Sequence, residues 1–398
     1  MVPWPAVGKR TALACGWGLA GGMSAIGLIR LFRSESQPQL IGLQGIGMWL
    51  LIPAYPLALA AGLTRRRALT AVAVVLAVGQ VVWMSKLYET GQGVAAPSGS
   101  ATLHLVTANT LLDNPEMARL AADLAGTGAD VILLQEITPE HVTELRAAGL
   151  LDDYPHQVLD PLPGYQGGVI LSKLPIISGR PIDVAGFPMT RADIATATGT
   201  VRLINVHTVA PVTESQARRW RAQLHALAQM QPPVPGALVL AGDFNATQDH
   251  APMAALLAGG MRDAFNEAGH GIGATWPQWS GPIFPLMRLD HVLVSDSVVV
   301  LSAQVQANPG SDHRRLAVDL ALPPAASGSA TPSAPEQLSV SAQSAAAPSR
   351  VGRRRFPGPR PGRRIAATPS GRPVGAARRI STGVRKRLSA LPVEPAFR

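Results

Sequence analysis

The sequence predicts three transmembrane helices followed by an α/β or α+β sandwich. Three apolar stretches without a charged residue lie in the first hundred of the 398 residues. From residue 101 to residue 322, strand-like and helix-like runs alternate over about 220 residues, which is typical of packed sheets and helices. We therefore expect a membrane anchor over residues 1–90, a Gly/Ala/Ser linker over 91–100 and a folded domain over 101–322.

The three apolar stretches cover residues 11–29, 40–63 and 68–84. A helix needs about 20 apolar residues to cross a bilayer, so the first two are long enough and the third is slightly short. Pro53 and Pro56 predict a kink in the second. The alternative for the first is a cleaved signal peptide. Two further spans follow it, so the chain stays in the membrane in either case.

Positive charges flank the three spans unevenly. The residues before the first span and the turn between the second and third hold five of them: Lys9, Arg10, Arg65, Arg66 and Arg67. The other ends of the spans have fewer, partly offset by Glu35 and Glu89. Positive loops stay in the cytoplasm, so three crossings place everything after residue 84 outside the cell. We expect a multi-pass protein of the cell membrane with an extracytoplasmic folded domain.

The net charge of +10 belongs to the ends of the chain. Residues 1–100 carry +6 and residues 323–398 carry +12, whereas residues 101–322 carry −8 and all nine histidines. A domain that binds nucleic acid through its phosphates needs lysine and arginine, so this distribution argues against a basic DNA-binding globule. The single cysteine, Cys15, excludes an intrachain disulfide and a cysteine-based zinc site.

Periodicity within 101–322 predicts ten strands and three helices. The expected strands are at 102–108, 130–135, 167–172, 181–184, 193–197, 200–206, 236–241, 290–294, 298–306 and 316–320. The expected helices are at 115–126, 139–148 and 213–230. The last of these places Trp220, Leu224 and Leu227 on one face.

Residues 323–398 consist mainly of Ala, Ser, Pro, Gly and Arg, with Phe356 and Phe397 as the only aromatic residues. Such a segment buries too little apolar surface to offset its ordering entropy, so we expect a disordered basic tail. Its arginine clusters could bind anionic lipid, an anionic wall polymer or nucleic acid. A solvated extension without a function is equally compatible with the composition.

Acids, amides and histidines recur where the expected strands end or begin: Asn109, Glu136, His207, Asp243, Asn245, Asp290, Ser311, Asp312 and His313. A single Asp or Asn at a strand end usually caps a turn, and a lone His is usually satisfied by one hydrogen bond. These residues fall into six segments, all at strand ends, and together they instead predict that several loops converge on one site.

The motifs that hold these residues resemble the endonuclease/exonuclease/phosphatase superfamily, which includes deoxyribonuclease I, abasic-site endonucleases, neutral sphingomyelinases and inositol-polyphosphate phosphatases. They are QE, GGVILSKLPI, NVHT, GDFN, RLDHVLVS and SDHRRLAV, with ATW at 274–276 as a weaker match. The resemblance covers residues 102–320. It implies a four-layer sandwich, in which two mixed, mostly antiparallel sheets are flanked by helices and the site lies at one rim. It also implies a metal-dependent hydrolase of phosphate ester bonds.

The resemblance also implies the metal ligands. Glu136, with Asn109 and Asp312, is expected to bind Mg²⁺, with Mn²⁺ as an alternative. One or two carboxylates completed by water and substrate phosphate suit a small hard cation.

By the same resemblance, Asp243 activates or orients the attacking water and Asn245 holds the nucleophile or the phosphate. His313, paired with Asp290, and His207 are expected to donate to phosphoryl oxygens as negative charge builds. An aspartate beside an imidazole raises its pKa and fixes its tautomer. Either Asp243 or His313 could be the general base.

Two positions depart from the pattern of the superfamily. Leu111 stands where many nuclease members carry an acid, and His291 stands where a tyrosine is common. A second metal carboxylate and a nuclease-like geometry are therefore less expected.

An anchor at the outer membrane face favours a phosphorylated lipid or a prenyl diphosphate as the substrate. The architecture is similar to that of actinobacterial membrane phosphatases linked to teicoplanin resistance. The aromatic segment 276–287 either enters the headgroup region or packs as a core loop. The alternatives are a membrane-bound extracellular nuclease acting on DNA or RNA, and a degenerate binding scaffold. Monoester, diester and diphosphate hydrolysis all stay open.

Overall fold

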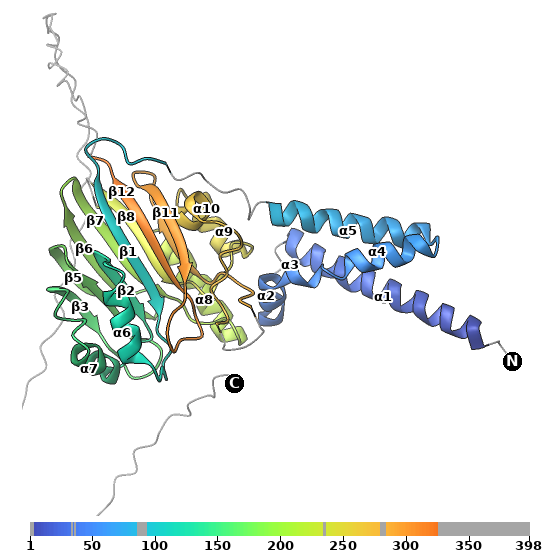
Figure 1. The fold of residues 1–398 in the computed structure, drawn as a ribbon, viewed down its shortest axis with the longest axis horizontal. Helices are drawn as coiled ribbons and strands as arrows, with labels where there is room; N and C mark the ends of the chain where they lie inside the picture. The colour runs from blue at the N-terminus through green and yellow to red at the C-terminus, as the bar shows by residue number, and fades with distance from the viewer. Residues whose placement is uncertain are drawn as a thin grey trace, which may run out of the picture. The chain divides into compact units, whose positions relative to one another are not determined.

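The computed structural model of the chain describes residues 4–32, 35, 37–85, 94–233, 236–278 and 284–324. The tail that we expected to be disordered lies outside the described residues from residue 325 onward, as does the start of the expected linker. Within the described part, two six-stranded sheets pack against each other (Figure 1).

The first sheet has the order β11-β12-β1-β2-β4-β3. Only β1 and β2 run parallel, and every other neighbouring pair is antiparallel. Its strands are β1 (Ala101–Asn109), β2 (Val131–Gln135), β3 (His156–Asp160), β4 (Gly168–Ser172), β11 (Val299–Gln306) and β12 (Arg315–Leu322).

The second sheet has the order β5-β6-β7-β8-β10-β9, and here β7 and β8 form the parallel pair. Its strands are β5 (Ile176–Asp183), β6 (Pro188–Thr196), β7 (Gly199–His207), β8 (Gly236–Asp243), β9 (Arg262–Asp263) and β10 (Asp290–Val294).

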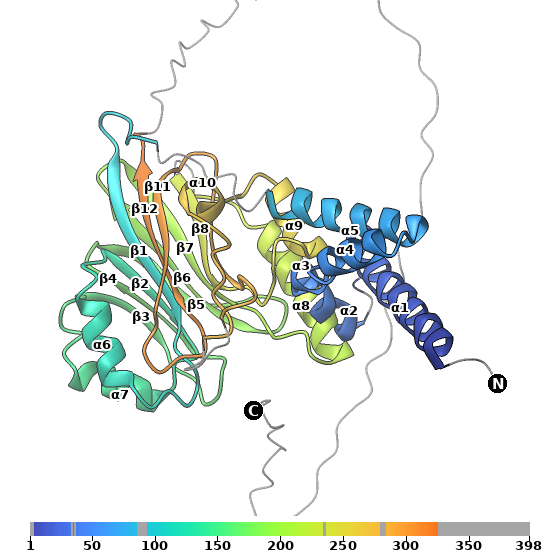
Figure 2. The same ribbon diagram turned by 45° about the vertical axis from the view of Figure 1, so that its right-hand side comes forward.

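Helices cover the outer face of each sheet (Figure 2). The side chains of Leu120 and Leu145 pack on the first sheet, and those of Trp220 and Met253 pack on the second. The helices are α6 (Met117–Ala125) and α7 (Pro139–Ala147) on the first sheet and α8 (Glu214–Ala228) and α9 (Ala251–Ala258) on the second, with α10 (Ala264–Ala268) beside β10 and β11. A separate apolar core fills the space between the sheets. This is the four-layer sandwich of two mixed sheets that the sequence predicts.

The strands that sequence periodicity placed poorly lie at the sheet edges or next to them. The expected strands at 181–184 and 193–197 overlap only the last residues of β5 and β6 and run one residue past each. β5 is an edge strand with mostly exposed side chains, and it contains Gly179 and Pro181. Edge strands tolerate such residues, so the apolar alternation that marks a strand is missing there. β3, β9, α9 and α10 were not expected at all.

The described part of the anchor contains α1 (Trp4–Phe32), α2 (Pro38–Gly45), α3 (Gly47–Leu50), α4 (Ala54–Leu63) and α5 (Arg67–Ser85). α1 and α5 are long and apolar enough to cross a membrane. The segments Pro38–Gly45 and Gly47–Leu63 reach that length only together, and they are bent by 72°. The described residues therefore hold two candidate spans, or three if the bent pair counts as one.

The sharp bend in the second stretch lies at Ile46, although we expected a kink at Pro53 and Pro56. Pro53 does interrupt the helix between α3 and α4. A closely packed glycine lies on either side of the larger bend. A Cβ on Gly45 would lie 2.7 Å from the Met287 Sδ, and one on Gly47 would lie 2.9 Å from Trp83. A side chain at either position would therefore require Met287 or Trp83 to shift.

The bend directs α2 into the folded domain. Ile41 is 3% exposed and belongs to the apolar cluster that also contains residues of α8 and α9. Burial of its side chain stabilises this packing by about 1.5–3 kcal/mol. The buried Gln44 donates to the Asp249 carbonyl and, over 3.0 Å, to Glu35. The Glu35 carboxylate in turn accepts from the backbone N–H of Ala251, the first residue of α9. α2 thus packs as an outer helix of the sandwich.

Candidate active site

The two parallel strand pairs bring the predicted site residues to one end of the sandwich. β1 ends at Asn109, which pairs with Gln135 just before Glu136. β7 ends at His207 in register with Asp243 at the end of β8. β10 runs antiparallel to β8 and starts at Asp290, opposite Asp243. The sheet registers therefore explain why residues far apart in sequence meet here.

Backbone strain marks the same turns. Glu136 and Asn245 have positive φ angles of 60° and 45°, a region that non-glycine residues rarely occupy. Gly242, directly before Asp243, has φ 143°, and a Cβ there would lie 2.0 Å from the Val206 carbonyl oxygen. Only glycine can precede Asp243 without displacing β7.

Asn109 bridges the acids of the two sheets. Its Nδ2 donates to Glu136 Oε1 over 3.0 Å and to Asp243 Oδ2 over 3.1 Å. Its Oδ1 accepts from the Leu111 N–H, while the Leu112 N–H donates to Glu136 Oε2 over 2.8 Å. The segment after β1 thus contributes the backbone N–H groups of Leu111 and Leu112. Leu111 stands where many nuclease members carry an acid.

Both predicted histidines face the Asp243 carboxylate. His207 Nε2 lies 3.7 Å from Glu136 Oε1 and 3.8 Å from Asp243 Oδ2. His313 Nε2 lies 3.8 Å from the same Asp243 oxygen, and its Nδ1 lies 2.8 Å from Asp290 Oδ2. The pairing of His313 with Asp290 that the resemblance implies is therefore present in the geometry.

Asn245 holds the other side of this carboxylate. Its backbone N–H donates to Asp243 Oδ1 over 2.8 Å, and its Nδ2 donates to Asp243 Oδ2 over 3.2 Å and to the Thr208 carbonyl over 2.9 Å. With Asn109, two amides thus fix the orientation of Asp243.

Burial shifts the pKa values of the site residues in different directions. It raises the pKa of Glu136 and of Asp243, and it lowers the pKa of His207. Burial alone would also lower the pKa of His313, but the carboxylates of Asp290 and Asp243 raise it to about 10. One histidine is therefore held as a cation and the other as a neutral ring, which suits two different proton-transfer or donor roles.

The acidic cluster fits a divalent cation. The ligand atoms of Asp243, Asp290 and His313 lie within 4.8 Å of one another, and Glu136 is hydrogen-bonded into the same cluster through Asn109. Because His313 is held as a cation and offers no free lone pair, the cluster presents carboxylate oxygens, which suit Mg²⁺. Asp290 Oδ1 is buried and has no hydrogen-bond partner among the described residues, so the cluster keeps acceptor capacity.

The other expected metal ligands lie at the rim of this cluster. Asp312 Oδ2 accepts from the Trp276 indole over 3.1 Å, and the Asp312 charge raises the pKa of Glu136. Asn109 presents its Nδ2 to the acids while its oxygen is bonded to Leu111. Metal binding by Asn109, Glu136 and Asp312 stays a prediction.

A second buried charged group lies behind the site, and sequence reasoning missed it. His291 Nδ1 lies 2.6 Å from Asp263 Oδ2, and its Nε2 lies 2.9 Å from the carbonyl of Ala246 in the loop after Asp243. Burial would raise the pKa of Asp263, but Arg288 and His291 hold it well below its usual range. His291, noted only as a departure from the motif, thus braces the loop that follows Asp243.

Two aromatic rings beside His207 were also missed. Tyr165 and Phe187 lie edge-on to the His207 ring, at centroid distances of 6.2 and 6.1 Å. Tyr165 is exposed at the rim, and Phe187 is buried. The only sequence signal for Tyr165 is its place two residues before the GGVILS motif.

The model of the endonuclease/exonuclease/phosphatase family matches residues 106–313, which is just over half of the chain. The chain belongs to the endonuclease/exonuclease/phosphatase family. Members of this family are metal-dependent hydrolases that act on phosphate ester bonds, and so is this chain. The buried acids and histidines described above lie within the matched range.

Solved structures of this family are similar to the chain. Family members from Beutenbergia cavernae and Bacteroides vulgatus share 19% and 20% sequence identity with it. Each alignment covers 56% of this chain, with 72% and 99% of the respective structures and TM-scores of 0.46 and 0.48. A 3′ phosphatase from Neisseria, bound to a product DNA hairpin, is 20% identical over 54% of this chain and 98% of its own, with a TM-score of 0.45. No curated protein matches the chain.

Proposed function

We propose that this family member hydrolyses a phosphate ester or diphosphate of a membrane lipid, such as a prenyl diphosphate, at the outer face of the membrane with Mg²⁺. One observation carries the proposal: the loop that starts at Asp243 ends at His250, whose Nε2 lies 3.0 Å from the Ile41 carbonyl oxygen. Ile41 lies in α2, between two candidate membrane spans. A substrate embedded in the same bilayer would reach this end of the sandwich without leaving the membrane surface.

Exposed apolar side chains around the site support a lipid surface as the partner. Tyr165, Val212 and Phe284 are exposed, and each lies in a loop at the end of the sandwich where β2, β7 and β8 end. Phe284 also contacts the Trp49 ring of α3 at a centroid distance of 5.1 Å. Apolar side chains next to a membrane anchor can enter the headgroup region.

Among the site residues, His313 is suited to donate a hydrogen bond to a phosphoryl oxygen as negative charge builds there, because Asp290 holds it as a cation. Asp243, fixed by Asn109 and Asn245, is suited to accept a hydrogen bond from the attacking water and orient it. Mg²⁺, when bound by Glu136 and its neighbours, supplies charge neutralisation at the phosphate.

The test uses the full chain in detergent micelles with Mg²⁺. It measures phosphate release from prenyl diphosphates and phospholipid phosphates, and strand cleavage of plasmid DNA. We expect lipid hydrolysis that Asp243→Asn and His313→Ala abolish. His104→Ala is the matched control, since His104 is a half-buried histidine of β1 that pairs with Asp319. Plasmid cleavage without lipid hydrolysis would identify a nuclease instead. An intact metal site without turnover on any substrate would identify a binding scaffold.

A further inference from the structure

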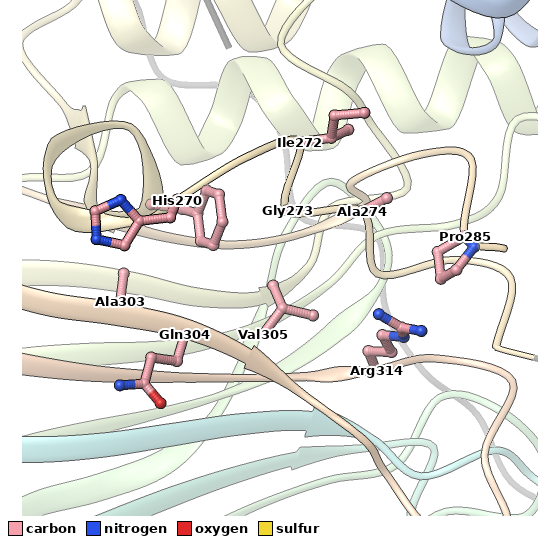
Figure 3. Close-up of a pocket in the computed structure, with 10 residues that line it drawn as sticks. His270, Ile272, Gly273, Ala274, Pro285, Ala303, Gln304, Val305 and Arg314 are labelled. Atoms are coloured by element: carbon pink, nitrogen blue, oxygen red, sulfur yellow. The ribbon is translucent and has the colours of Figure 1, made fainter. Parts of the chain in front are cut away.

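A cavity of about 460 Å³ lies beside the active site, between β11 and the segment that follows α10 (Figure 3). Its volume falls in the range of small-molecule sites, about 300–1,000 Å³. Much of its wall is apolar, with Ile272, Pro285 and Val305 among the lining residues, and Gln304 lines it from the exposed edge of β11.

The cavity and the active site share a wall. Arg314, which lines the cavity, directly follows His313, and its backbone N–H donates to the Thr275 carbonyl over 2.8 Å. The Thr275 hydroxyl oxygen accepts from the backbone N–H of Asp290 over 3.2 Å. The cavity therefore adjoins the segment that carries His313, one residue away along the chain.

Another wall of the cavity is continuous with the anchor. Ile272 packs against the apolar cluster of the anchor helices, which includes Met48 and Trp83. Pro285 lies between Phe284, which contacts the Trp49 ring, and Leu286, whose carbonyl accepts from the Trp49 indole over 2.8 Å. The cavity thus lies between the active site and the candidate membrane helices.

Arg314 gives the cavity a positive charge. Figure 3 shows its guanidinium among the lining side chains. No hydrogen bond or ion pair joins this half-buried guanidinium to another described residue. The neighbouring Arg315, in contrast, is paired with Asp123 and Gln306. A half-buried cation beside apolar walls suits a ligand that is both anionic and apolar.

We propose that this cavity binds the part of a lipid phosphate that adjoins the scissile bond, with its first carbons on the apolar wall and a non-reacting anionic oxygen at Arg314. The proposal rests on the proposed lipid-phosphate function. In this proposal, Arg314 and the cavity-lining residues of β11 determine which length of lipid chain the enzyme prefers. The phosphate that is hydrolysed lies at Asp243 and His313.

The test compares Gln304→Trp, which places a large ring at the cavity, and Arg314→Ala with the full-length wild type. The substrates are a farnesyl and an isopentenyl diphosphate, which differ in chain length. We expect the ratio of kcat/KM for the long chain over the short chain to fall at least tenfold in Gln304→Trp. Arg314→Ala should lower kcat/KM for the long chain at least tenfold, with partial recovery in Arg314→Lys. Ile177→Trp and Arg180→Ala, both exposed on β5, are the controls.

A binding measurement separates this proposal from the proposed function. In the Asp243→Asn background, a fluorescent prenyl phosphate should bind, and each cavity variant should weaken its Kd at least tenfold. If both variants turn over lipid phosphates with the wild-type ratio of kcat/KM and the wild-type Kd, the proposed role of the cavity is wrong and the proposed function stands. Binding that depends on the cavity, without turnover by the unmutated enzyme, would overturn the function and leave the cavity.

Discussion

The Nε2 of His250 donates a hydrogen bond to the carbonyl oxygen of Ile41, over 3.0 Å. The ring must carry its proton on Nε2, because Nδ1 accepts from the Thr247 N–H over 2.8 Å. Burial lowers the pKa of His250, which keeps the ring neutral and this tautomer available. The loop that begins at Asp243 is thereby attached to α2 of the anchor.

Replacing Gln44 tests this attachment. Gln44→Ala removes the donor to Glu35 and to the Asp249 carbonyl, at a cost of about 1–3 kcal/mol. We expect a lower Tm of the full chain in detergent and a lower kcat, because Asp249 belongs to the loop after Asp243. Thermal unfolding and phosphate release measure the two effects.

Gln39→Ala is the matched control, since Gln39 is exposed on the same helix. It should leave both Tm and kcat at wild-type values. Equal behaviour of the two variants would show that the contacts of α2 with the loop add nothing to stability or activity.

The pairing of His313 with Asp290 predicts the alkaline limb of the pH profile. His313 is charged up to a pKa of about 10, so activity that needs the cation should persist through neutral pH and fall toward pH 10. Asp290→Asn removes a negative charge and should move this limb to lower pH. The pH dependence of kcat/KM in both proteins is the measurement, and an unmoved limb would assign the alkaline pKa to another group.

The raised pKa of His313 also makes the stability of the fold depend on pH. A histidine whose pKa rises from 6.5 to about 10 on folding binds its proton more tightly in the folded chain. Its contribution is complete below pH 6.5 and is lost as the pH rises toward 10. Asp290→Asn should therefore flatten the fall of Tm over that window.

The core strands and the site were predictable because burial and position leave marks in the sequence. β2 and β10 are buried along their whole length, so they appear as short apolar runs. Asn109, Glu136, Asp243 and Asp290 adjoin strand ends, where a polar residue interrupts the apolar run. These residues meet in one cluster because β1 pairs with β2, and β7 with β8, in parallel. The strand ends in the sequence do not show which strands pair in this way.

Other features were not predictable because their cause lies in distant packing. α2 is as apolar as a membrane span, and only its contacts with α8, α9 and Met287 show that it packs on the sandwich. Asp263 and His291 are 28 residues apart, and their pairing depends on β9 and β10 lying side by side. β9 has two residues, too short for any periodicity.

Removing the metal tests the acidic cluster. EDTA should abolish phosphate release, and Mg²⁺ should restore it. Glu136→Gln, which keeps the shape but removes the charge, should raise the Mg²⁺ concentration for half-maximal activity at least tenfold. Glu140→Gln, exposed in the first turn of α7, should titrate as the wild type does. Unchanged Mg²⁺ dependence in Glu136→Gln would exclude this carboxylate as a ligand.

The proposed orientation is open to a direct topology test. A phosphatase reporter that works only outside the cytoplasm, fused after Ser100, should be active if the bent pair Pro38–Gly45 and Gly47–Leu63 makes the third crossing. Fused at Arg66, in the proposed cytoplasmic turn, it should be silent. The reverse pattern, or activity at both positions, would contradict the three-span topology and place the site on the other side.

Neutralising Asp263 tests the buried charge group behind the site. Asp263→Asn keeps an oxygen that can accept from the N–H groups of Phe265 and Asn266, but it leaves Arg288 and His291 without their counter-charge. Breaking a buried ion pair costs about 3–5 kcal/mol, so Tm should fall sharply.

The pH dependence of this loss identifies its cause. The pKa of Asp263 is lowered on folding, so its contribution is present above the ordinary pKa of 3.8 and is lost as the pH falls below it. Unfolding free energies of the wild type and Asp263→Asn should therefore differ most near neutral pH and converge in acid. Asp152→Asn, an exposed carboxylate, should track the wild type throughout. A difference independent of pH would mean that the substitution acts through packing and not through the charge.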